Sequence, residues 1–170
     1  MPRQLRRIVT GHDADGKSVV VIDGPPGAGF GELWVTDNTP ADNSVAGDAA
    51  QRRRKLEPPF CGSVFRYFVV MPEDPGVPVE ERERMTAQRF AEMDASHCRV
   101  DTSRHPAMHK TRTVDYIILL SGEVTLLLDK AQVELKPFDV VVQRGTNHAW
   151  LNKGKEPALL AAVLIDAKEV

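Results

Sequence analysis

The sequence predicts an all-β protein, an antiparallel barrel or sandwich with strands and one short helix ahead of it. Short apolar segments alternate with tight turns between residues 113 and 165, and no helical segment separates them. Strands connected in this way form antiparallel sheets rather than βαβ units. The chain has 170 residues, of which 42% are hydrophobic and 27% charged, enough for one globular domain with its own core.

Residues 1–100 are expected to add strands, a loop and a helix to this barrel. Two apolar segments, 7–10 and 18–22, flank an Asp- and Gly-containing turn, which is typical of a hairpin. The aromatic and β-branched segments 32–36 and 63–71 predict strands. Residues 80–95 have helical composition and are expected to pack as one helix on the outside of the sheet.

The barrel itself is predicted from a run of short strands with turns at Ser121-Gly122, Asp129-Lys130 and Gly145-Thr146. The chain is therefore expected to be a single domain, with residues 101–168 as the barrel core and residues 1–100 packed on it. The predicted strands span residues 113–120, 123–128, 132–136, 140–143, 149–152 and 158–165.

Charge, cysteine content and hydropathy bear on which partners and which cellular setting the sequence predicts. The formal charge is −2 with acids and bases mixed along the chain, which gives no electrostatic case for nucleic acid. The basic run from Arg52 to Lys55 is expected to be a solvated face, with an anion or partner contact as the alternative. Two cysteines make no disulfide framework, so a reduced, cytoplasmic setting is expected. No apolar run has the length of a membrane span, and no signal peptide is apparent.

Strand parity brings polar side chains together. Alternate residues of a strand face the same side, so His109 and Asp115 share one face. If the strand carrying His148 is its neighbour in a closed barrel, two imidazoles and one carboxylate meet in the interior. Such a set suits a catalytic divalent ion, with positions left for water and substrate. A buried Asp115 bound to Arg112 or Tyr116 is the structural alternative, although their parity points them away.

A second cluster of potential ligands precedes this strand. It is a weaker candidate, because its spacings fit no common zinc pattern. Its members are His97, Cys98, His105 and His109.

The segment from His109 to Asn152 resembles the two motifs of the cupin superfamily. The first motif, Gly-x5-His-x-His-x3,4-Glu-x6-Gly, is matched by His109, Asp115 and Gly122 at the same spacing. Thr111 stands at the second His and Ser103 at the opening Gly.

The second motif, Gly-x5-Pro-x-Gly-x2-His-x3-Asn, is matched in its second half by Gly145, His148 and Asn152. Gln143 stands at the Pro position, and Phe138 lies near the first Gly. The resemblance covers about residues 106–166.

The resemblance implies a double-stranded β-helix, or jelly-roll, barrel and a divalent metal ion. Fe, Mn, Zn or Ni would be held by His109, Asp115 and His148, which are also the expected catalytic residues. It further implies a small-molecule ligand and a homodimer. Expected to line the pocket are Thr111, His105, Gln143, Trp150 and Asn152.

Three functions remain open, because cupin folds host many reactions. The first is a metal-dependent enzyme on a small organic molecule, such as a dioxygenase, dehydratase or cyclase. The second is a metal-free epimerase or isomerase in which His109 and Asp115 act as a general acid/base pair. The third is a non-catalytic module that binds a small molecule.

Overall fold

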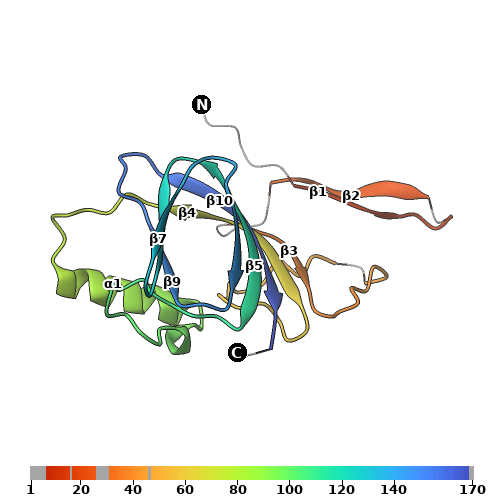
Figure 1. Ribbon diagram of the computed structural model, residues 1–170. Coiled ribbons are helices and arrows are strands. Elements are labelled where there is room, and N and C mark those ends of the chain that lie inside the picture. Colours follow the sequence, from red (N-terminus) through yellow and green to blue (C-terminus); the bar gives the residue numbers. More distant parts are fainter. Residues whose placement is uncertain (1–6, 16, 26–30, 46, 169–170) are drawn as a thin grey trace.

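Two antiparallel sheets form the barrel, as the sequence predicts (Figure 1). The computed structural model describes residues 7–15, 17–25, 31–45 and 47–168. The larger sheet has five strands in the order β3 (Glu32–Thr36), β4 (Ser63–Val70), β10 (Ala158–Asp166), β5 (Thr113–Ser121) and β8 (Val140–Arg144). The smaller sheet has three strands in the order β7 (Gln132–Leu135), β6 (Val124–Leu128) and β9 (His148–Leu151).

Alternation along the strands builds the core between the two sheets. Leu119 on β5 and Leu160 on β10 are 1% and 0% exposed, and they belong to one apolar cluster with Leu126 of β6. Each inward residue is followed by one that faces the other side, as the two-residue period of a strand requires. The same alternation turns His148 and Trp150 of β9 toward the inside.

The Ser121-Gly122 turn connects β5 of the larger sheet to β6 of the smaller sheet. Gly122 has a φ of 82°, and a Cβ at this position would lie 2.7 Å from the Cα of Ala158. Both facts require glycine here. The predicted turn is therefore also a point of close backbone approach to β10.

Strands β3 and β4 come from the first half of the chain but belong to the barrel wall. β4 pairs antiparallel with β10 along its whole length, from Ser63 opposite Ile165 to Val70 opposite Ala158. β3 pairs with β4 at the edge of the sheet. The predicted strands at 32–36 and 63–71 are confirmed, and they extend the barrel sheet rather than only cover it.

A hairpin of β1 (Arg7–His12) and β2 (Ser18–Gly24) projects away from the barrel (Figure 1). Its turn is organised by the Asp13 carboxylate, which accepts hydrogen bonds from the backbone N–H groups of Asp15 and Lys17 at 2.9 Å each. At its base, the Arg7 guanidinium donates to the Leu33 carbonyl at 2.9 Å. The predicted hairpin is thus confirmed.

The helix α1 (Val79–Glu92) lies beside the barrel and is followed by a short 3-10 turn, Ser96–Cys98. Its composition predicted a helix packed on the outside of the sheet. The helix does lie outside the strands, and its last turn contributes to the site, because the ring of Phe90, 7% exposed, packs edge-on against His109 with centroids 5.1 Å apart. Among the described residues, no helix combines the length and apolar character of a membrane span.

Phe138 predicts a measurable gain in stability on mutation. It has a φ of 75° and is 79% exposed, so its side chain gains little packing while its backbone occupies the left-handed region. We expect Phe138→Gly to raise the free energy of unfolding by about 0.5–1 kcal/mol, measured by urea denaturation, because the steric cost of that region is removed. Phe138→Ala, which removes the ring but keeps Cβ, is the control and should give no such gain.

Candidate functional site

A cavity of about 560 Å³ is lined by residues of both sheets and of α1, among them several of the predicted site residues. His109, Thr111, Asp115, His148 and Trp150 all line it. Its volume falls in the range of small-molecule sites, and its walls are largely apolar.

The two histidines lie side by side because their main chains pair. The N–H of His109 donates to the carbonyl of His148, and the reverse bond is also made, each at 2.9 Å. The two ring centroids are 4.3 Å apart, with 45° between the ring planes. Residues 39 positions apart in the sequence therefore present their rings to one cavity.

Each imidazole is held in one tautomer. Nδ1 of His109 lies 2.9 Å from the Ala107 carbonyl, and Nδ1 of His148 lies 2.9 Å from the Thr146 carbonyl. A carbonyl oxygen only accepts, so both Nδ1 atoms carry the proton and both Nε2 atoms keep a lone pair. This is the arrangement in which histidine ligates a metal through Nε2.

Burial keeps both imidazoles neutral. It lowers the pKa of His109, against the backbone hydrogen bond to Ala107. For His148, only 2% exposed, burial and the neighbouring His109 lower the pKa to about 3. Both side chains are consequently in the protonation state that a metal ligand requires.

Asp115 is a buried carboxyl group with one free oxygen. It is 4% exposed, and its Oδ1 has no hydrogen-bond partner. Burial raises its pKa to about 6, although the Thr113 hydroxyl and the Arg66 charge act in the opposite direction. The structural alternative does not hold here, since the guanidinium of Arg112 lies 3.6 Å from Asp166.

The free Nε2 atoms of His109 and His148 are suitable ligands for a divalent metal. The Asp115 carboxylate does not lie close enough to both of them to complete a group of three. Among the described residues, the one set of three ligand groups whose donor atoms all lie within 4.8 Å of one another is elsewhere: Glu57, His97 and Cys98. His109, Asp115 and His148 thus share a cavity without forming a closed set of three in this arrangement.

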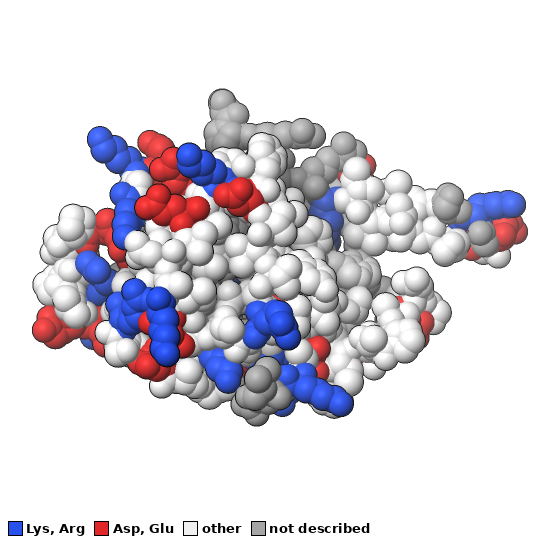
Figure 2. All heavy atoms as spheres, viewed as in Figure 1, with Lys and Arg blue, Asp and Glu red and all other residues white. Residues whose placement is uncertain are grey.

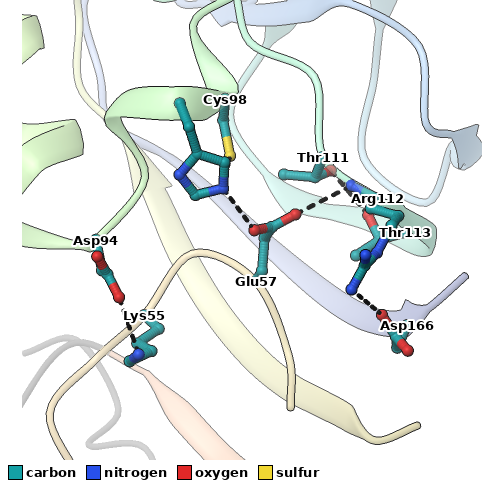
Figure 3. A network of polar contacts seen from close by, with 9 residues as sticks. Lys55, Glu57, Asp94, Cys98, Thr111, Arg112, Thr113 and Asp166 are labelled. Carbon is teal, nitrogen blue, oxygen red and sulfur yellow. Dashed lines mark hydrogen bonds and ion pairs between the residues drawn. The ribbon is translucent and has the colours of Figure 1, made fainter. Parts of the chain in front are cut away.

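The Glu57 cluster shows what becomes of the second group of potential ligands. Figure 3 shows Glu57 between the turn that carries Cys98 and the backbone of Arg112. His97 Nε2 lies 2.9 Å from a Glu57 oxygen and 3.5 Å from the Cys98 sulfur. Burial raises the pKa of the Cys98 thiol to about 12. His97 and Cys98 therefore meet Glu57, and not His105 or His109.

Some predicted lining residues lie outside the cavity wall. His105 is not among its lining residues, and its Nε2 atom lies 2.7 Å from a carboxylate oxygen of Glu73. The Gln143 amide donates to Thr146 at the turn that precedes β9. The Asn152 amide, 0% exposed, donates to the carbonyls of Val70 and Glu156 at 2.9 and 2.8 Å. Their roles in the structure are to hold turns and strand ends.

Residues from outside the two motifs complete the cavity. Leu56 and Phe68 contribute apolar surface, and Phe90 comes from α1. Arg53 and Arg54 also line it, although their segment was expected to be solvated. The signal for them in the sequence was the basic run from Arg52 to Lys55, for which an anion contact was the alternative interpretation.

The raised pKa of Asp115 predicts a pH-dependent effect of Asp115→Asn. The folded-state pKa exceeds the unfolded value, so the stability contributed by the neutral acid is complete below about pH 4 and lost as pH rises through about 6. Asparagine stays neutral throughout. Relative to the unmutated protein, Asp115→Asn should gain about 2–3 kcal/mol between pH 4 and pH 8, measured by urea unfolding in chelator. The exposed Asp37→Asn should show no such trend.

Residues 97–165 of the chain are similar to a known protein family. A family model described as Cupin domain matches residues 97–165. Phomopsin biosynthesis cluster protein C' of Diaporthe leptostromiformis is 42% identical over 65 residues, 37% of this chain and 34% of that protein. The Cupin-domain-containing oxidoreductase srdD of Neurospora crassa is 30% identical over 145 residues, 81% of this chain and 58% of that protein.

Among solved structures, a Cupin 2 conserved barrel domain protein from Salinispora arenicola CNS-205 aligns with a TM-score of 0.39 and 17% identity, covering 62% of this chain and 64% of that one. The chain spans from about a third to under two thirds of the length of the relatives named above. Residues 97–165 carry both motifs, both histidines and strands β5 to β9, and they form a cupin domain with its double-stranded β-helix barrel.

Proposed function

We propose that the cavity is the site of a metal-dependent oxidoreductase that acts on a small organic molecule. His109, His148 and Asp115 would hold the divalent ion, with Fe, Mn, Zn and Ni all compatible with two imidazoles and a carboxylate. The observation that carries the proposal is the pair of neutral imidazoles with free Nε2 atoms in one cavity. The name of the Neurospora crassa relative supports the reaction class.

The bound ion would supply Lewis acidity toward a substrate oxygen. The protein's own groups would orient the substrate and exclude water. Phe68 and Trp150 face each other with ring centroids 6.1 Å apart, and Phe90 covers His109. These rings form an apolar wall beside the ligand groups, in which polar interactions with the substrate are strengthened.

Asp115 supports a second candidate, a metal-free isomerase or epimerase. Its pKa of about 6 and its unpartnered Oδ1 suit a group that takes up and returns a proton near neutral pH. This candidate requires activity that survives chelators. A non-catalytic binding module would instead be stabilised by a ligand that it does not convert.

Elemental analysis of the purified protein tests the first proposal. About one equivalent of a transition metal per chain is expected, and dialysis against a chelator should remove it together with activity. Full activity in the chelated protein would favour the acid/base candidate.

We further propose a homodimer. The β1–β2 hairpin carries uncharged side chains along its length and charged ones at its tip (Figure 2). Ile8, Val20 and Val21 on it are more than half exposed, and Tyr116 and Val142 of the barrel are at least half exposed. A two-stranded hairpin is marginally stable alone, and exposed apolar clusters mark interfaces. Light scattering should give twice the mass of one chain, and Val20→Glu should lower it.

A cytoplasmic setting is also proposed. Cys61 is exposed and Cys98 buried, and both are free thiols. Free thiols persist where the surroundings are reducing.

A further inference from the structure

The cavity lining carries more positive than negative side chains. A short segment ahead of β4 passes the cavity and adds two arginines that lie outside the matched cupin domain. Beside the carboxyl groups of Glu92 and Asp115, the lining includes the guanidinium groups of Arg53, Arg54, Arg66 and Arg89.

Most of these guanidinium groups are accounted for by their surroundings. Arg66 donates to Glu32 at 3.0 Å and to the Lys55 carbonyl at 2.9 Å. Arg53 donates to the Glu92 carbonyl at 3.2 Å. Arg89 is exposed to solvent on α1.

Arg54 is different. Among the described residues it has no hydrogen bond or ion pair, and its Nε is buried without a partner. The charge of the Glu32 carboxylate acts to raise the pKa of Arg54, but Glu32 is already bound to Arg66 and lies 3.7 Å from Arg52. Burial lowers the pKa of Arg54, yet an arginine side chain does not deprotonate in proteins. A half-buried guanidinium that keeps its charge favours an anion beside it.

The rest of the wall is apolar. Leu56 lies two residues after Arg54, and Phe68 and Trp150, whose ring centroids are 6.1 Å apart, also line the cavity. A ligand that fills about 560 Å³ therefore meets a hydrophobic surface over most of its length and positive charge at the arginine end. A half-buried guanidinium without a protein partner suits a singly charged, planar carboxylate, which it can bind through two parallel hydrogen bonds.

We propose that Arg54 binds the carboxylate of an amphipathic substrate, whose apolar body lies along Leu56, Phe68 and Trp150 toward the two histidines. This inference rests on the proposed function, because it takes the cavity to be the ligand site. Arg54 is then the residue that selects anionic over neutral ligands.

Calorimetry with octanoate and its uncharged analogue octanamide tests this. The full chain is used as purified, at constant ionic strength, with its metal content measured in the same sample. The unmutated protein should bind octanoate at least about tenfold more tightly than octanamide, the typical effect of a charge-assisted hydrogen bond. Arg54→Gln should remove this preference by weakening octanoate binding at least about tenfold, to the level of octanamide. Arg54→Lys, which keeps the charge but not the planar fork, should fall between them.

Arg84→Gln is the matched control, because Arg84 is an exposed arginine of α1 that does not line the cavity. It should behave like the unmutated protein, and thermal melting should show that all variants are folded. Equal binding of the two probes, no octanoate binding at millimolar concentration, or a preference that survives Arg54→Gln would overturn the inference. Displacement of octanoate by an equal concentration of inorganic phosphate would overturn the assignment to a carboxylate.

The metal measurement separates the two proposals. An Arg54-dependent preference in protein without metal would contradict the metal-dependent function and leave the carboxylate site standing. Stoichiometric metal in a protein that shows no preference for octanoate over octanamide would contradict the carboxylate site and leave the metal-dependent function standing.

Discussion

His148→Ala is expected to lose its metal, from about one equivalent per chain to less than about a tenth, and to weaken metal affinity at least about 100-fold. Loss of a supporting hydrogen bond to a ligand already weakens metal binding 10- to 100-fold, and the substitution removes the ligand itself. The fold should survive, because the bonds that pair position 148 with His109 are made by the main chain. Elemental analysis and metal titration measure the effect.

The control for this experiment is His97→Ala. The His97 side chain is 65% exposed, belongs to the Glu57 cluster and does not line the main cavity. It should keep the full metal content. If metal is retained in His148→Ala and lost in His97→Ala, the ion binds at Glu57 and Cys98 and the proposed site is wrong.

Arg66→Ala is expected to destabilise the folded protein by about 3–5 kcal/mol, the usual cost of breaking a buried ion pair. Arg66 is 2% exposed and its partner Glu32 is 7% exposed. Removing the guanidinium leaves the Glu32 carboxylate inside the protein, with its nearest remaining positive group, Arg52, at 3.7 Å. Urea unfolding at neutral pH measures the change.

A double variant identifies the cause. Arg66→Met with Glu32→Met removes both charges and should recover most of the lost stability. Arg84→Ala breaks an exposed ion pair with Glu81 and should have no measurable effect. A loss in the double variant as large as in Arg66→Ala would show that packing, and not the unpaired charge, determines the cost.

The barrel strands could be predicted from sequence because each is specified locally. Thr113 to Leu120 is rich in β-branched and apolar residues, the Gly122 turn follows, and β5 indeed runs from Thr113 to Ser121. The same two-residue period puts His109, Thr111 and Asp115 on one face, and all three line the cavity.

Features that depend on contacts between distant segments could not be predicted in this way. The composition of α1 predicts a helix but does not specify that Phe90 covers His109. Arg54 lies in a basic run whose sequence is typical of a solvated surface. Only the tertiary structure, in which the segment ahead of β4 passes the cavity, shows that Arg54 lines it. Asn152 matches a motif position, yet it binds the ends of β4 and the turn before β10, where strand pairing alone determines its partners.

The reciprocal bridge between His109 and His148 has an evolutionary consequence. The separation of these two positions is fixed by peptide groups, which every amino acid except proline supplies in full. Mutations at either position would therefore exchange one donor atom for another at a nearly constant spacing. If these positions hold an ion, a lineage carrying this barrel could change its preferred ion, or lose the ion, through single-codon changes that leave the main-chain bridge in place.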